Sequence, residues 1–471
     1  MKVILHIDFN SYFATVEQQA NPRLRGKPVG VTGGDRLKRT VLGAASVEAK
    51  RFGVKTGMQI WEARKLCPQI ILVPGDSDKY LETTKRFLGI LKDYTPYLEV
   101  FSIDECFLEL YKTRGPASQV SRRASSLAFA RCGYAPGPPP GCHPSFCDAE
   151  QIALYIKQRI KAEIGEWITC SIGISYNKLM AKLAGSLQKP DGLVVIANQE
   201  ETMKVLDQIA LDEICGIGPR IKKRLNNLGI FDFKTLRKAP LEALLASFKS
   251  YGQTLYNMAR GIDHSPLIPF YEKGEVKSIG HRHTIDHDTN QEAEIKQILL
   301  KLSEMVAARL RAKNLVGKTI HLWYREAFNL ASHSSSGNVF FGDGMQNTIH
   351  YTHDGLEIFQ AAWKIFHLIW PARNATACET GGPARNATAC KAGGNKNKIR
   401  MVGLSVSSLK PVLPQNLSLL PETAKQEKII KTLDKVNDKF GEFTLQRGIL
   451  LDSTVIRRKP NPFLSERRFK L

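Results

Sequence analysis

Three carboxylates interrupt the most apolar strand-like runs of this chain, and they constrain its fold more than any other feature. Val3–Phe9 reads as a buried strand with Asp8 near its end. In Tyr97–Leu110, two apolar half-strands flank Asp104 and Glu105, which predicts a hairpin or a bent strand pair. Carboxylates that end buried strands are costly unless they bind a cation. The pattern therefore favours an α/β (α+β) protein with a cation site at the ends of its strands.

The same three residues form a ligand set suited to two metal ions. Two Mg²⁺ ions about 3.5 to 4 Å apart need bridging carboxylates, and Asp8 beside the Asp104–Glu105 pair would supply them. In such a site one ion activates an attacking hydroxyl and the other holds a triphosphate. The alternative is that all three are solvated acids in turns.

Charge and composition narrow the class of partner. The 471 residues include 67 Lys and Arg against 45 Asp and Glu, a net charge of +22. This excess of positive charge favours a polyanion as the binding partner, with nucleic acid as the first candidate and a membrane surface as the second. No run approaches the 18 or so apolar residues that a membrane span needs. The nine cysteines are scattered, so we expect no disulfide framework and a reducing cytoplasm.

The chain also shows where its parts should begin and end. Residues 199–262 have a short helical pattern, and 263–276 read as a linker. Glu292–Leu310 predicts an amphipathic helix, and Lys318–Tyr324 and Ile399–Val406 predict strands of a further α/β domain. Residues 113–147 and 371–398 are biased in composition and read as surface insertions.

Three motifs together resemble those of Y-family translesion DNA polymerases, especially the bacterial polymerase IV and V types. They are His6–Phe13 (HIDFNSYF), Ser102–Phe107 (SIDECF) and Ser171–Lys178 (SIGISYNK). The resemblance implies a right-hand architecture that acts on primer-template DNA and deoxynucleoside triphosphates (dNTPs), with low fidelity and without proofreading. It divides the chain into palm (1–25 and 76–198), fingers (26–75), helical thumb (199–262), linker (263–276), little finger (277–457) and basic tail (458–471). It also implies a monomer.

In this resemblance Asp8, Asp104 and Glu105 are the catalytic metal ligands, and the Phe9 carbonyl completes the nucleotide-side Mg²⁺ site. Phe13 matches the steric gate, a ring that leaves no room for a ribose 2′ hydroxyl. The alternative for Phe13 is an ordinary core aromatic.

The triphosphate contacts depart from the family pattern. Lys178 and Lys182 are four residues apart on a helix expected to begin near Asn177, and Lys182 matches the triphosphate contact. The family's fingers add a Tyr and an Arg, but Val47 and Lys50 stand at those positions here. Lysine keeps the charge without the bidentate fork, and valine has no hydroxyl. Weaker nucleotide binding is therefore expected.

Two further motifs predict contacts outside the palm. Gly216-Ile-Gly218 resembles a helix-hairpin-helix that binds the DNA backbone, with Lys222, Lys223 and Arg224 supplying charge. An ordinary tight turn is the alternative. Gln415–Leu420 (QNLSLL) resembles the peptide that docks into the bacterial sliding clamp through Gln415, Leu417, Leu419 and Leu420, although leucines before a helix are often core. Val31, Gly43 and Ala44 are small residues expected to roof the nascent base pair.

Three other hypotheses remain open from the sequence. Cys132, Cys142, His143 and Cys147 lack paired zinc-ligand spacing, so a chance cluster is favoured over a zinc site. A diguanylate cyclase would use a related palm, and Thr32–Asp35 (TGGD) partly matches its signature, but the continuation does not. A catalytically weak, clamp-associated DNA-binding scaffold is the remaining alternative, because Val47 and Lys50 replace the family's triphosphate contacts.

Overall fold

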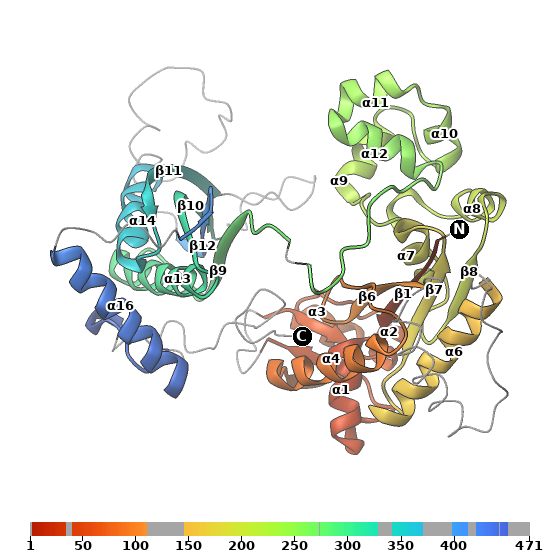
Figure 1. The fold of residues 1–471 in the computed structure, drawn as a ribbon, viewed down its shortest axis with the longest axis horizontal. Helices are drawn as coiled ribbons and strands as arrows, with labels where there is room; N and C mark the ends of the chain where they lie inside the picture. The colour runs from red at the N-terminus through yellow and green to blue at the C-terminus, as the bar shows by residue number, and fades with distance from the viewer. Residues whose placement is uncertain are drawn as a thin grey trace. The chain divides into compact units, whose positions relative to one another are not determined.

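The computed structural model describes residues 2–33, 40–110, 146–272, 274–327, 342–370, 398–412, 421–441 and 443–450. These residues form two compact units that divide between Gly274 and Glu275 (Figure 1). Both units combine sheets with helices, so the predicted α/β class is confirmed.

A five-stranded sheet with the order β5-β6-β1-β7-β8 forms the centre of the first unit. Its strands are β1 (Val3–Phe9), β5 (Leu98–Val100), β6 (Glu105–Leu110), β7 (Cys170–Ser175) and β8 (Leu193–Ile196). Strand β1 is antiparallel to both of its neighbours, whereas β7 and β8 are parallel. Because β1 is buried on both faces, it is apolar throughout except at His6 and Asp8. The predicted strand and the predicted hairpin, β5 with β6, are both confirmed.

Helices cover both faces of this sheet. Leu5 and Ile7 pack with one group of helices, which comprises α1 (Tyr12–Ala20), α4 (Ser77–Lys92) and α6 (Phe146–Glu163). The opposite face carries α7 (Lys178–Leu187), which begins as expected after Asn177, whose side chain accepts a hydrogen bond from the Met180 amide. Helix α7 approaches β7 so closely that a Cβ at Gly173 would lie 2.1 Å from the Ala181 carbonyl oxygen. Only glycine fits there.

A smaller sheet, β3-β2-β4, follows α1 in the chain. It consists of β2 (Val29–Thr32), β3 (Leu42–Ala45) and β4 (Ile71–Pro74), with the short helices α2 (Val47–Arg51) and α3 (Ile60–Leu66). Leu42, Ala49 and Ile60 form part of its own small core. Strand β3 also reaches toward α1, because a Cβ at Gly43 would lie 3.8 Å from the Phe13 ring.

A helical region comes next, and the chain that leaves it is tied to the start of α7. Its helices are α8 (Gln199–Leu206), α9 (Pro219–Asn226), α10 (Phe233–Lys238), α11 (Leu241–Phe248) and α12 (Ser250–Met258). After α12, the Asn177 amide donates to the Gly261 carbonyl, and the Asp263 carboxylate accepts from the Leu179 amide. The chain then runs beside β5, where the Ile268 amide donates to Glu99. Glu99 also forms an ion pair with Lys178 at 2.8 Å.

The second unit is built on a five-stranded antiparallel sheet, in which four strands follow the order β11-β10-β12-β9 and the short β13 pairs with β10. Its elements are β9 (Ser278–Thr289), α13 (Glu292–Ala312), β10 (Leu315–Glu326), β11 (Gly342–Thr352), α14 (Gly355–Ile369), β12 (Ile399–Ser407), β13 (Lys410–Pro411) and α16 (Pro421–Phe440). The predicted helix and the two predicted strands of this region are confirmed. Leu322 and Leu404 share a core with Leu299 of α13 and Phe366 of α14.

Candidate active site

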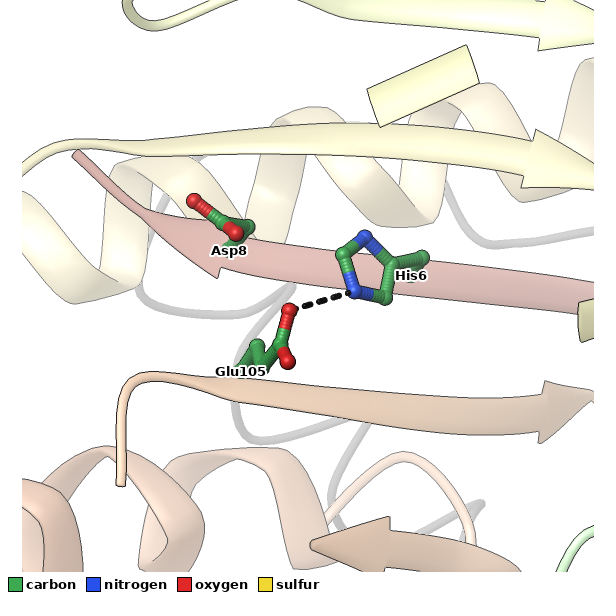
Figure 2. Close-up of side chains that lie close together, drawn as sticks. All are labelled: His6, Asp8 and Glu105. Carbon is green, nitrogen blue, oxygen red and sulfur yellow. Dashed lines mark hydrogen bonds and ion pairs between the residues drawn. The ribbon is translucent and has the colours of Figure 1, made fainter. Parts of the chain in front are cut away.

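The register of two strands places Asp8 directly opposite Glu105. His6 lies two residues before Asp8 and therefore on the same face of β1. Figure 2 shows the His6 ring turned toward Glu105 from the neighbouring strand. Ligand atoms of His6, Asp8 and Glu105 all lie within 4.8 Å of one another, a spacing that could hold a metal ion.

Asp104 lies beside this group but outside it. Its carbonyl accepts from the Phe9 amide at 2.9 Å, which fixes the start of β6 against the end of β1. Its carboxylate bonds to the Ser102 hydroxyl. Burial raises the pKa of Asp104, and the charges of Asp8 and Glu105 raise it further, against the effect of Ser102. The three predicted ligands thus share one electrostatic environment.

Two lysines neutralise the facing carboxylates. Lys182 of α7 lies 2.5 Å from Glu105, and Lys189, just after that helix, lies 2.7 Å from Asp8. Burial alone would raise the pKa of Glu105, but the hydrogen bonds from His6 and Lys182 outweigh it and lower the pKa to about 2. The carboxylate is therefore ionised at neutral pH.

Sequence reasoning missed Lys189. The turn that carries it is held at the end of β1, because the Asp191 amide donates to the Asn10 side chain at 2.8 Å. Lys189 and Asp8 are 181 positions apart in the chain. The one available signal was a lysine immediately after the helix that carries Lys182.

His6 opens the first motif, and the sequence alone indicates no role for it. Its side chain is 2% exposed, and its Nε2 lies 3.2 Å from Glu105. The ring packs against Phe107 at 4.7 Å, while a Cβ at Gly185 would lie 3.1 Å from Nδ1. Burial lowers the pKa of His6, although Glu105 acts against this effect. A neutral ring that faces an ionised Glu105 carries its proton on Nε2, and this N–H donates a hydrogen bond to the carboxylate.

Phe13 lies on α1 and stacks on Tyr80 of α4. The ring centroids are 4.4 Å apart and the planes differ by 17°. The Tyr80 hydroxyl donates to Glu17 at 2.8 Å, so the supporting ring is itself held in place. Phe13 is only partly buried, and Gly43 leaves space next to it.

Val47 and Lys50, the two positions that depart from the family pattern, both belong to α2. Val47 is the first residue of α2, and Lys50 lies one turn further on. Partial burial and the Lys189 ammonium lower the pKa of Lys50, whereas Asp8 and Asp104 act in the opposite direction. Lys50 therefore lies within the field of the acidic site. Of the three small residues expected over the nascent pair, Val31 and Ala44 are buried and Gly43 is exposed.

The predicted helix-hairpin-helix forms a sharp turn before α9. Gly216 has a φ of 109°, a left-handed conformation that favours glycine, and its carbonyl accepts from the Tyr251 hydroxyl. Gly218 precedes α9 with open space around it. Lys222 pairs with Asp212 at 2.6 Å, and Arg224 donates to the Ser247 carbonyl. Lys223 is exposed.

Several predicted sites lie outside the described residues. These are the clamp peptide with Gln415, Leu417, Leu419 and Leu420, the basic tail, and the first three members of the Cys132, Cys142, His143 and Cys147 cluster. Cys147, assigned to the end of the first insertion, belongs instead to the first turn of α6, which begins at Phe146.

Comparison with known proteins assigns the chain to a family. The impB/mucB/samB family matches residues 7–186, and its C-terminal domain matches 276–419. A DNA polymerase IV of Moorella thermoacetica is 33% identical over 450 residues, covering 95% of this chain and 96% of that protein. This chain belongs to the Y family of DNA polymerases.

Further matches to this Y-family chain agree. DNA polymerase IV 1 of Bacillus subtilis is 28% identical over 469 residues, covering 98% of this chain and 96% of that protein. The thumb domain of DNA polymerase iota matches residues 212–263. A solved Y-family DNA polymerase chimera shares the fold with a TM-score of 0.64 at 22% identity, covering 86% of this chain and 98% of its own. Within the described parts of this Y-family chain, no helix is long and apolar enough to cross a membrane.

Proposed function

We propose that this Y-family polymerase extends a DNA primer along a template and past damaged template bases, using dNTPs and two Mg²⁺ ions. The observation that carries the proposal is the facing pair of Asp8 and Glu105, with Lys182 and Lys189 against them. Hard carboxylate oxygens are the ligands that Mg²⁺ prefers, and the ammonium groups already at this site show that it accepts positive charge. The residues present therefore fit a divalent ion.

Asp8, Asp104, Glu105 and the Phe9 carbonyl would hold the ions. When bound, they would activate the primer 3′ hydroxyl and neutralise the triphosphate. The chain's own residues do the rest. Lys182 and Lys189 pass from the carboxylates to the triphosphate oxygens, which are the stronger acceptors once the carboxylates are engaged. Phe13, supported by Tyr80, excludes a 2′ hydroxyl.

We also propose the division into palm, fingers, thumb, linker and little finger at the boundaries expected from the sequence. The separation of two compact units at Gly274 lies inside the proposed linker. Low fidelity, a lack of proofreading, a monomeric cytoplasmic enzyme and docking to a sliding clamp complete the proposal. Clamp-stimulated synthesis should be lost in Leu419→Ala plus Leu420→Ala, and stimulation that survives both changes would contradict docking.

Primer extension on undamaged and abasic templates tests the reaction. The native chain should extend both, and Asp104→Ala plus Glu105→Ala should extend neither. Glu200→Ala plus Glu201→Ala is the matched control, because it also removes an adjacent acidic pair but in the first turn of α8. A native chain that binds DNA without extending a primer would instead be the weak scaffold that Val47 and Lys50 leave open.

A further inference from the structure

Trp61 of α3 presents an indole to solvent while its polar group is held in place. Its side chain is 62% exposed, and its Nε1 donates to the Gln59 side chain at 2.8 Å. Gln59 is fixed in turn, because its backbone amide donates to Glu62 at 3.0 Å. Tryptophan is among the largest contributors to cores and interfaces when it is buried. Here the ring is oriented by hydrogen bonds, and its apolar surface remains available to a ligand.

The same face of α3 is basic. Arg64 and Lys65 follow Trp61 by three and four residues, so all three side chains share one side of the helix. Arg64 and Lys65 are exposed, and neither forms an ion pair with any residue that the structure describes. We call Trp61, Arg64 and Lys65 the Trp61 face. A flat aromatic surface beside two exposed cations complements a base attached to phosphates better than it complements an apolar helix.

The Trp61 face lies close to the place proposed for the nascent base pair. Gln59 forms a β-bridge with Val41, which is 47% exposed. Two residues beyond Val41, Gly43 borders the Phe13 ring. Two residues of extended chain span about 7 Å, roughly the thickness of two stacked bases. A template strand that passes Gly43 therefore reaches Gln59 and Trp61 within one or two nucleotides.

The geometry points to Trp61 as a stacking platform for the first unpaired template base ahead of the nascent pair, with Arg64 and Lys65 binding its flanking phosphates. This inference rests on the proposed function, because a template-directed polymerase holds single-stranded template at that point. The platform is independent of sequence, since every base offers a π face.

Anisotropy of a labelled primer-template tests the stacking. The native chain is titrated with a substrate whose first unpaired template nucleotide beyond the templating base carries a normal base, and with one in which that nucleotide is abasic. The abasic substrate should bind about tenfold more weakly, as expected for the loss of one stacked base. Trp61→Ala should bind both substrates equally, at the weaker level. Trp61→Phe should restore most of the difference, and Leu66→Ala, a change of another exposed side chain of α3, should preserve it.

Three outcomes overturn the inference. In the first, Trp61→Ala still distinguishes the normal from the abasic substrate. In the second, Trp61→Ala loses affinity equally for blunt-ended and overhanging DNA. In the third, Trp61→Ala binds DNA as tightly as the native chain. The last would leave a protein partner as the occupant of the Trp61 face. Primer extension by the native chain is measured alongside. If extension fails, the proposed function fails; if extension succeeds without base-dependent binding, only the stacking is wrong.

Discussion

The acidic site on the central sheet and the glycine turn before α9 are both proposed to meet phosphate, yet they handle charge in opposite ways. At the sheet, Asp8 and Glu105 face each other, and they are neutralised by Lys182 of α7 and by Lys189 in the turn after it. At the turn, the phosphate-binding groups would be backbone amides, and Lys222 is already paired with Asp212.

The two sites differ in whether the cations bound to them can be exchanged. Cations at the sheet can replace one another, since an ammonium group and a metal ion compete for the same oxygens. At the turn, little exchange is needed, because Gly216, Gly218 and Lys223 are already exposed. Changes at the sheet should therefore alter reaction rate, whereas changes at the turn should alter how long DNA stays bound.

The largest effect should come from Glu105→Gln. This change removes the charge that Lys182 and His6 hold in place and weakens metal binding. We expect kcat/KM for single-nucleotide incorporation to fall about 1000-fold, equivalent to several kcal/mol. Asp212→Asn is the control at the turn and should change the value less than about threefold. A Glu105→Gln enzyme within tenfold of the native one would break the comparison.

His6 should have the next largest effect, as a positioning residue that acts through Glu105. His6→Phe keeps the packing against Phe107 but loses the hydrogen bond. We expect kcat to fall about 10- to 100-fold with little change in the KM for dNTP. His6→Asn, which can still donate, should recover part of the loss. If His6→Phe and His6→Asn are equally stable to heat and equally active, the hydrogen bond does not position Glu105.

Phe13→Ala should act on the sugar and leave duplex binding unchanged. Removal of the ring opens space beneath the nucleotide, so the preference for deoxyribonucleotides should fall about 100-fold. Competition between dNTP and rNTP in primer extension measures this preference. Tyr80→Leu should produce a smaller loss, because it removes the stacked support and keeps the gate. Unchanged sugar selection in Phe13→Ala would remove Phe13 from this role.

Acid should destabilise the folded chain through Glu105. The pKa of Glu105 is lowered from its ordinary value of 4.5 to about 2. Its stabilisation is complete above pH 4.5 and is lost as the pH falls toward 2, because the folded chain binds that proton less readily than the unfolded chain. After allowance for screening by solvent, we expect about 1–2 kcal/mol. Urea unfolding at pH 6 and pH 3.5 should show a smaller pH dependence for Glu105→Gln than for the native chain.

The smallest expected effect is a difference in the salt dependence of DNA binding between the Lys223→Ala and Lys222→Ala variants. Lys223→Ala should weaken DNA binding regardless of sequence and lower the slope of log affinity against log salt by about 1. Lys222→Ala should change that slope much less, because Lys222 is already paired with Asp212. A salt series on one primer-template measures both. Identical slopes for the two variants would mean that the ion pair opens when DNA binds.

Sequence patterns predicted the elements that local chemistry determines. The apolar run of Val3–Phe9 became β1, and Asn177 caps α7 through its own side chain. Contacts set by register or by distant turns could not be predicted in this way. His6 meets Glu105 only because β1 and β6 pair in this register. Lys189 meets Asp8 only because its turn is attached to Asn10.

The same limit applies to the connection after α12. Its composition reads as a linker, and its polar and proline residues carry no pattern. The Phe270 amide nevertheless donates to the Leu98 carbonyl on the edge of the central sheet, and the Ile268 amide donates to the Glu99 carboxylate. An edge strand offers unpaired backbone groups to any nearby chain, and composition does not reveal which chain will use them.

The attachment of the chain after α12 to the start of α7 has a mechanical consequence. Asn177 and Leu179 bond to residues 261 and 263, and Lys178 joins the outgoing chain through Glu99. A pull on that region is therefore borne first by the opening turn of α7. Lys182 lies one turn further along the same helix. A displacement of the chain after α12 should therefore shift the ammonium group beside Glu105, because both are held by the first two turns of α7.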